Sequence, residues 1–181
     1  MPEAGERVLL IGYGNPGRLD DGLGPALAAA VEKLEIAGVT VEAAYQLNVE
    51  DAAAAAEHDV VIFTDADVTG PEPFFFRRIA PEAVPSFSTH SVEPQTVLGL
   101  AWQMFGACTE GYILGIRGYC FNDFGESLSE RARANLDAAV GFLEPLLRGR
   151  EFQKAAECFE ELCVSGAELC SEDETCRPEN M

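Results

Sequence analysis

The chain has 181 residues, and 48% of them are hydrophobic, which is enough for one domain with a buried core. Its formal net charge of −19 would repel nucleic acid and anionic membranes, and it favours either simple solubility or a cationic or basic partner. No apolar run is long enough to span a membrane and the N-terminus lacks the pattern of a signal peptide, so we expect a cytoplasmic protein without a membrane partner.

Apolar segments typical of strands alternate with segments typical of helices along most of the chain. Strands are predicted at 7–14, 38–45, 59–67, 73–80 and 111–119, and helices at 21–36, 48–58, 91–106, 127–149 and, as a short addition, 151–163. Pro25 suits a first helical turn, Asn48 suits a helix N-cap, and Pro145 should disturb the long helix near its end. Because the apolar strands need cover on both faces, this alternation predicts a single three-layer α/β/α domain with a mostly parallel sheet.

A shift in composition near residue 150 divides the chain into an α/β domain, residues 1–150, and an acidic C-terminal extension, residues 151–181. Four of the six cysteines lie in the extension: Cys158, Cys163, Cys170 and Cys176. Their C-x4-C-x6-C-x5-C spacing matches no usual zinc or iron–sulfur pattern. Without an export signal, we expect reduced thiols there.

The segment "LLIGYGNPGRLDDGLGP" contains Gly12-x-Gly14-x-x-Gly17 directly after the first predicted strand. This spacing is typical of a dinucleotide site, but its context argues against one. Pro16 interrupts the turn, Asp20 and Asp21 would face the pyrophosphate, and no carboxylate ends the second strand to hold a ribose. The sequence therefore disfavours a nucleotide-binding oxidoreductase.

Three polar residues follow predicted strands at positions where such folds bind ligands. Asp21 comes just past the first strand, Asp65 ends another, and His90 lies in a polar loop before a helix. Together they could form a three-ligand site for a divalent metal with open coordination positions. Each of them could also be an ordinary polar residue with its hydrogen bonds satisfied, and either Asp20 or Asp21 could be a helix cap. The other histidine, His58, is expected to be a solvated surface residue.

The strings "GYGNPGRLDDGLGP", "DVVIFTDAD" and "STHSVEP" resemble the motifs of the hydrogenase maturation proteases, over roughly residues 7 to 148. The resemblance implies a twisted sheet of about five strands between helices. It implies metal ligation by Asp21, Asp65 and His90, with Asp20 as a neighbouring acid and Asp67 as a possible substitute ligand. Gly12, Gly14 and Asn15 would shape the turn that presents Asp21, with glycine backbone angles closed to other residues. The loop "YQLNVED" departs from the family, in which many members carry a glycine pair.

The family members are endopeptidases that remove a C-terminal extension from the large-subunit precursor of nickel–iron hydrogenases. The resemblance implies that the precursor is the partner and supplies the nickel that the enzyme recognises. The sequence shows no Ser-His-Asp, Cys-His or HExxH signature, so a metal would activate the scissile carbonyl or a water, or else Asp21 or Asp65 would act as a general base.

Two other functions share parts of this pattern. A non-catalytic nickel-binding assembly factor would use the same three ligands without cleaving anything. Peptidyl-tRNA hydrolases also begin with G-x-G-N-P-G, but they continue to a segment with a catalytic histidine, where this chain reads "RLDDGLG". The charge of −19 also opposes tRNA binding, so we expect no nucleic-acid partner. The sequence does not indicate whether the protein is a monomer or an oligomer.

Overall fold

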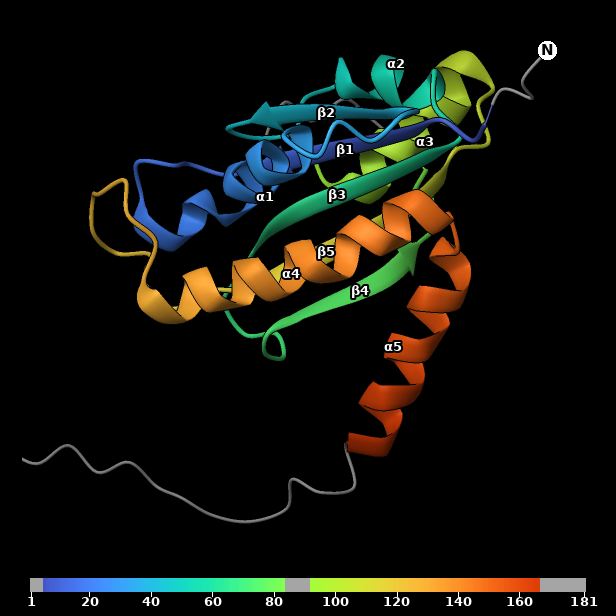
Figure 1. The fold of residues 1–181 in the computed structure, drawn as a ribbon. Helices are drawn as coiled ribbons and strands as arrows, with labels where there is room; N and C mark the ends of the chain where they lie inside the picture. Colours follow the sequence, from blue (N-terminus) through green and yellow to red (C-terminus); the bar gives the residue numbers. More distant parts are fainter. Residues whose placement is uncertain (1–4, 84–91, 167–181) are drawn as a thin grey trace, which may run out of the picture.

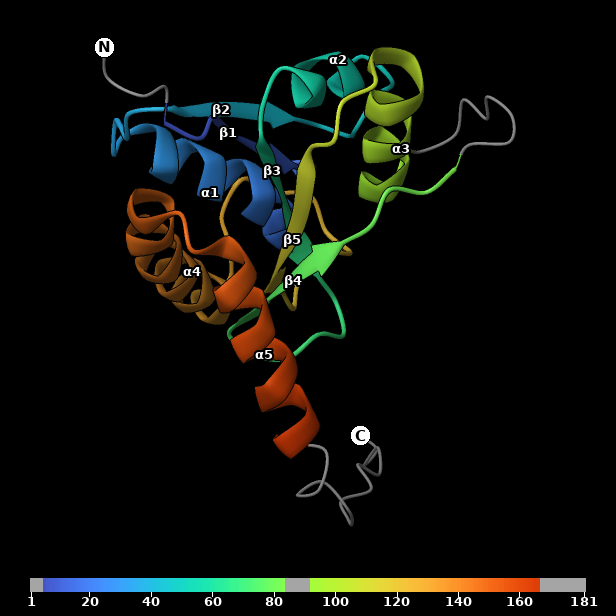
Figure 2. The same ribbon diagram turned by 90° about the vertical axis from the view of Figure 1, so that its right-hand side faces the viewer.

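The computed structural model describes residues 5–83 and 92–166, which form a five-stranded sheet with helices on both faces (Figures 1 and 2). The strands are β1 (Val8–Tyr13), β2 (Val39–Ala44), β3 (Val60–Asp67), β4 (Phe74–Ile79) and β5 (Glu110–Arg117). The helices are the 3-10 helix η1 (Leu19–Gly22), α1 (Leu23–Glu32), α2 (Asp51–Ala56), α3 (Pro94–Phe105), α4 (Glu130–Gly149) and α5 (Phe152–Gly166). The predicted three-layer α/β fold with a mostly parallel sheet is confirmed.

The strand order is β2-β1-β3-β5-β4, and every neighbouring pair is parallel except β4 with β5. From β1 the chain moves to β2 on one side and then returns to β3 on the other side. This change of direction is a topological switch point, and open α/β sheets bind ligands outside the carboxyl ends of the two strands that flank it. Here those strands are β1 and β3.

Side chains alternate between the two faces along each buried strand and fill two separate cores. On β1, Val8 and Leu10 join the core under α1, α4 and α5, whereas Leu9 and Ile11 join the core under α2 and α3. Figure 2 shows α2 and α3 on one side of the sheet and α1, α4 and α5 on the other. Double-sided burial explains why these strands read as continuous apolar runs in the sequence.

Two glycines let α1 approach the sheet closely. A Cβ on Gly12 would lie 2.2 Å from the carbonyl oxygen of Gly24, and a Cβ on Gly24 would lie 2.2 Å from the carbonyl oxygen of Tyr13. The expectation of special backbone angles holds for Gly14, whose φ is +136°, whereas Gly12 is required by this close packing. Pro25 lies in the first turn of α1, as predicted.

One helix detail differs from prediction, and another agrees with the predicted extent of its helix. Asn48 is not the N-cap of α2, which begins later, at Asp51. Instead, the backbone N–H of Asn48 donates to the Asp51 carboxylate at 2.7 Å, so the polar residues form a turn before the helix. Pro145 lies inside α4, and the helix continues beyond it to Gly149.

Helix α5 covers the outer strand β4 with aromatic side chains. Phe152 and Ala156 are buried in the same core as the strands, and the ring of Phe159 lies 5.5 Å from that of Phe74 and 5.3 Å from that of Phe142. The first half of the predicted C-terminal extension therefore completes the core on the α4 face. Cys170 and Cys176 lie outside the described residues.

Candidate active site

Asp21 and Asp65 come together at the switch point, one after each flanking strand. Asp21 lies in η1, in the segment that follows β1, and Asp65 lies near the carboxyl end of β3. Gly14 separates them, because a Cβ there would lie 2.1 Å from the carbonyl oxygen of Asp21 and 3.6 Å from Oδ1 of Asp65. Only glycine leaves room for the two segments to meet in this way.

The loop between β1 and η1 holds the Asp21 carboxylate in place. The backbone N–H of Asn15 donates to Oδ2 of Asp21 at 2.9 Å. The side chain of Asn15 in turn accepts a hydrogen bond from the backbone N–H of Gly17 at 2.9 Å. Asn15 therefore shapes the turn that presents Asp21, as the resemblance implied.

The environment of Asp65 favours its neutral form. Partial burial of the side chain raises the pKa of Asp65 to about 7. A hydrogen bond from the N–H of Ala66 acts to lower this pKa, and the negative charges of Asp21, Asp67 and Glu93 act to raise it further. The neighbouring Tyr13 hydroxyl also has a raised pKa, first because it is buried and then because of the charge on Asp65. Concentrated negative charge of this kind is common at functional sites.

Asp65 opens into a cleft of about 220 Å³ between β3, β4 and the start of α3. Tyr13, Phe75, Arg77 and Glu93 contribute to its walls. None of these four residues is predicted by the sequence. Their signals were weak: Tyr13 precedes the glycine turn, Glu93 is three residues beyond His90, and Arg77 follows Phe75 by the two-residue repeat of a strand.

Asp20 has a structural role, in contrast to its neighbour. Its side chain is completely buried and accepts hydrogen bonds of 2.7 to 2.9 Å from the backbone N–H groups of Tyr119, Cys120 and Ser129 and from the Ser129 hydroxyl. Burial alone would raise the pKa of Asp20, but these four bonds outweigh it and lower the pKa. Asp20 therefore fastens the loop that joins β5 to α4 onto the β1 loop.

Three other residues named from the sequence are Asp67, the possible substitute ligand, and the two histidines, His58 and His90. Oδ1 of Asp67 accepts from the backbone N–H groups of Thr69, at 2.8 Å, and Gly70, so the side chain stabilises the turn after β3. His58 is a partly exposed surface residue, and its ring nitrogens bond at 2.7 Å to the carbonyl of Ala54 and at 2.9 Å to the Thr40 hydroxyl. His90 lies outside the described residues.

Within residues 5–83 and 92–166, no three His, Cys, Asp or Glu side chains form a group that could hold a metal ion. The charge of Asp21 helps to raise the pKa of Asp65, which shows that the two carboxylates lie close to each other.

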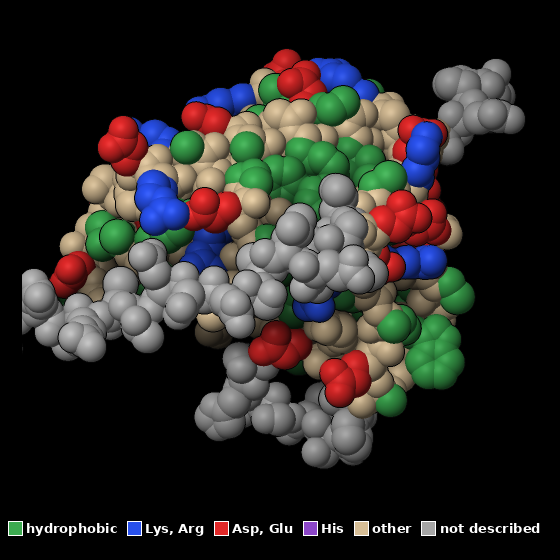
Figure 3. All heavy atoms as spheres, turned by 90° about the horizontal axis from the view of Figure 1, so that it is seen from below, with side chains coloured by type: hydrophobic (Ala, Val, Ile, Leu, Met, Phe, Trp, Pro, Cys, Tyr) green, Lys and Arg blue, Asp and Glu red, His purple; other side chains and the backbone are tan. Residues whose placement is uncertain are grey.

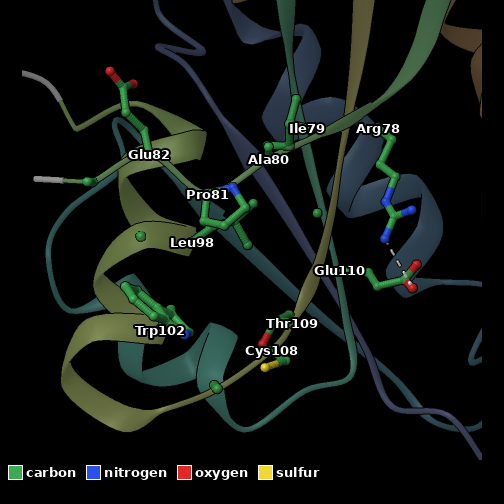
Figure 4. Close-up of a pocket in the computed structure, with 14 residues that line it drawn as sticks. Arg78, Ile79, Ala80, Pro81, Glu82, Leu98, Trp102, Cys108, Thr109 and Glu110 are labelled. Atoms are coloured by element: carbon green, nitrogen blue, oxygen red, sulfur yellow. Dashed lines mark ion pairs between the residues drawn. The ribbon is translucent and has the colours of Figure 1, made fainter.

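A larger cavity of about 780 Å³ lies at the opposite end of the sheet (Figure 4). Pro81, Leu98, Trp102 and Cys108 line it, and the ion pair between Arg78 and Glu110, at 3.4 Å, stands at its side. Glu110 begins β5, whereas Asp65 pairs with Gly115 further along that strand. This cavity is therefore separate from the carboxylate site.

The described surface carries acidic and basic side chains interspersed with apolar ones. On the face in Figure 3, red and blue side chains surround patches of green hydrophobic side chains. Among the described residues, no helix is both long enough and apolar enough to cross a membrane.

The comparisons with known proteins give relatives by structure only. No family model matches the sequence, and no curated protein matches it. The solved structures include the NiFe hydrogenase maturation protease HycI from Thermococcus kodakarensis KOD1, with a TM-score of 0.63 and 21% identity over 80% of this chain and 94% of that one.

Two further structures agree with it. The hydrogenase maturating endopeptidase HybD from E. coli has a TM-score of 0.59 and 23% identity over 80% of this chain and 94% of that one. The hydrogenase 2 maturation peptidase from Thaumarchaeota archaeon SCGC_AB-539-E09 has a TM-score of 0.58 and 20% identity over 78% and 98% of the two chains. The chain therefore has the fold of the hydrogenase maturation endopeptidases.

Proposed function

We propose that this protein is an endopeptidase that removes the C-terminal extension from the large-subunit precursor of a nickel–iron hydrogenase. One observation carries the proposal: Asp21 and Asp65 meet at the switch point, beside a cleft, in a chain with the fold of the maturation proteases. The short motifs around these two residues are those that the sequence shares with that family.

The nickel belongs to the precursor, and we propose that Asp21, Asp65 and His90 complete its ligand set. His90 precedes Glu93, which lines the Asp65 cleft, by three residues. Two oxygens and one imidazole nitrogen are donors that suit divalent nickel.

The cleft suggests how the remaining groups act on a peptide. A divalent metal at such a site polarises a carbonyl or lowers the pKa of a water. Asp21, oriented by the Asn15 N–H, and Asp65 would hold that metal through their carboxylate oxygens. Tyr13, Phe75 and Arg77 line the cleft of about 220 Å³ beside Asp65, and we place the residue next to the scissile bond there.

The test is the intact mass of a nickel-loaded large-subunit precursor after incubation with this protein. We expect loss of one defined C-terminal peptide with the unmodified chain and no loss with His90→Ala. The control is His58→Ala, which removes the other histidine of the chain and should leave cleavage intact. Cleavage that survives His90→Ala would refute the ligand assignment.

Asp65→Asn and Asp67→Asn form a second matched pair. We expect Asp65→Asn to abolish cleavage, and Asp67→Asn to retain it because the Asp67 carboxylate is bonded to its own turn. The reverse result would assign the ligand role to Asp67. If a correctly paired, loaded precursor binds but loses no mass, the protein is a nickel-binding assembly factor and the protease proposal fails.

A further inference from the structure

Three large apolar side chains project into solvent from loops at the carboxyl end of the sheet. Tyr45 follows β2, Val68 follows β3, and Phe124 lies in the loop after β5. Their exposed fractions are 71%, 59% and 90%, respectively. Because β2, β3 and β5 are parallel, all three loops leave the same edge of the sheet, the edge that carries Asp21 and Asp65.

Backbone hydrogen bonds hold the loops that carry these three residues against other segments at the same end of the sheet. The carbonyl of Ala44 accepts from Gly14 at 3.1 Å, and the carbonyl of Asp67 accepts from Gly118 at 2.9 Å. The carbonyl of Gly125 accepts from Leu19 at 2.8 Å. Tyr45 and Val68 directly follow, and Phe124 directly precedes, the residue whose carbonyl accepts one of these bonds.

The loop that carries Phe124 is held especially firmly. Besides the Gly125 bond, it is fastened at both ends by the buried Asp20 carboxylate, through Tyr119, Cys120 and Ser129. Figure 1 shows this loop beside the segment that follows β1. An exposed aromatic side chain on an anchored loop loses little conformational entropy on binding, which is typical of residues that dominate protein interfaces.

We propose that Tyr45, Val68 and Phe124, together the rim patch, form the docking surface for the hydrogenase large-subunit precursor. The proposal rests on the proposed function. The chemistry of the partner surface follows from the charges around the patch. Glu50, Asp123 and Glu126 are exposed in the same loops, and within the described part of the chain none of them forms an ion pair. Arg18 is also exposed and donates to the carbonyl of Phe121 in the Phe124 loop, so the acids are in excess but not alone. The matching surface is therefore apolar, with an excess of basic side chains around the apolar contacts.

Binding to nickel-free precursor tests the rim patch separately from cleavage. We expect Phe124→Ser, measured by biolayer interferometry with the full-length chain, to raise the Kd by about tenfold or more. The matched control is Trp102→Ser, an aromatic side chain that is 57% exposed at the opposite end of the sheet. It should change the Kd by less than about twofold, as expected outside an interface. Because Phe124 is 90% exposed, the melting temperature should stay unchanged in its variant.

Charge reversal tests the acidic edge. Asp123→Lys combined with Glu126→Lys should slow association by about tenfold at low salt, and the difference should shrink at high salt. Glu57→Lys is the control, since Glu57 is an exposed acid after α2, at the far end of the sheet. Equal association rates for the double variant and the control would overturn the assignment of a basic partner edge.

The outcomes separate this surface from the proposed function. If the unmodified chain cleaves loaded precursor but Phe124→Ser changes neither Kd nor kcat/KM, the rim patch is overturned and the protease stands. If binding depends on Phe124 but no cleavage occurs, the docking surface stands and the protease fails. If the unmodified chain binds no more tightly than Phe124→Ser, or if it forms a dimer that Phe124→Ser disrupts, the surface does not serve the precursor.

Discussion

Asp20 and Asp21 are adjacent and chemically identical, yet the structure gives them opposite roles, so their Asn variants make a sharp test. In Asp20→Asn, one carboxylate oxygen becomes an NH2 group. Oδ1 of Asp20 accepts only from Ser129 N, whereas Oδ2 accepts from Tyr119 N, Cys120 N and the Ser129 hydroxyl. The best amide orientation keeps the oxygen at the Oδ2 position and leaves the N–H of Ser129 facing another donor.

The cost follows from these contacts. One buried N–H without an acceptor costs about 1–3 kcal/mol. The three remaining bonds lose the assistance of the charge, which makes such bonds roughly twice as strong as neutral ones. Burial of a neutral amide is easier than burial of a carboxylate and offsets part of this loss. We expect Asp20→Asn to lower the free energy of unfolding by about 2–4 kcal/mol, equivalent to a fall of about 5–15 °C in Tm for a chain of this size.

Asp21→Asn is the matched control. Its carboxylate is half-exposed and accepts a hydrogen bond from Asn15 N, and removing its charge relieves repulsion with Asp65. We expect its free energy of unfolding to change by less than about 1 kcal/mol, while cleavage of the precursor is lost. Urea unfolding followed by circular dichroism measures the first quantity, and intact mass measures the second. If both variants are destabilised equally, the reasoning is refuted.

The pH dependence of Asp20→Asn has a definite sign. The folded pKa of Asp20 lies below its ordinary value, so its contribution to stability is present above the unfolded pKa of about 3.9 and is lost as the pH falls through the folded pKa. The difference in unfolding free energy between the unmodified chain and Asp20→Asn should therefore be constant above about pH 5 and shrink below pH 4. A difference that grows on acidification would contradict this assignment.

Two further predictions concern packing. Gly24→Ala should lower the free energy of unfolding by about 3 kcal/mol or more, because the new Cβ would lie 2.2 Å from a backbone oxygen. Gly141→Ala should raise it by up to about 1 kcal/mol, because the new Cβ lies inside a helix and meets nothing within 4 Å. Thermal unfolding measures both variants, and an unchanged stability of Gly24→Ala would refute the close approach of α1. Phe152→Ala should lower the free energy of unfolding by about 3–5 kcal/mol, because it opens a cavity under α5. The control is Gln153→Ala, which changes an exposed neighbour and should leave the stability nearly unchanged. Equal urea midpoints for these two variants would show that α5 does not complete the core.

The sequence identified the fold class because two patterns in it are local. Apolar strands that alternate with helical segments require cover on both faces, and the structure has that cover. The glycine turn and the carboxylates at strand ends were also readable, since the position of a residue after a strand is a local property. Asn48 was misjudged as an N-cap because its intrinsic preference is weaker than the turn that it forms with Asp51 before the helix.

The resemblance already separated Asp21, as a ligand, from Asp20, as a neighbouring acid. The structural role of Asp20 could not be read from the sequence, because its partners lie 99 to 109 residues away in the chain. The same is true of the cleft, in which Tyr13, Arg77 and Glu93 converge on Asp65 from separate elements. By itself, the sequence determined the α/β layers and the placement of Asp21 and Asp65 after strands, through hydrophobic periodicity and turn chemistry. Only the tertiary structure decided that Asp20 is buried and anchors the loop between β5 and α4, because burial and hydrogen bonding depend on contacts between segments that the chain brings together only on folding.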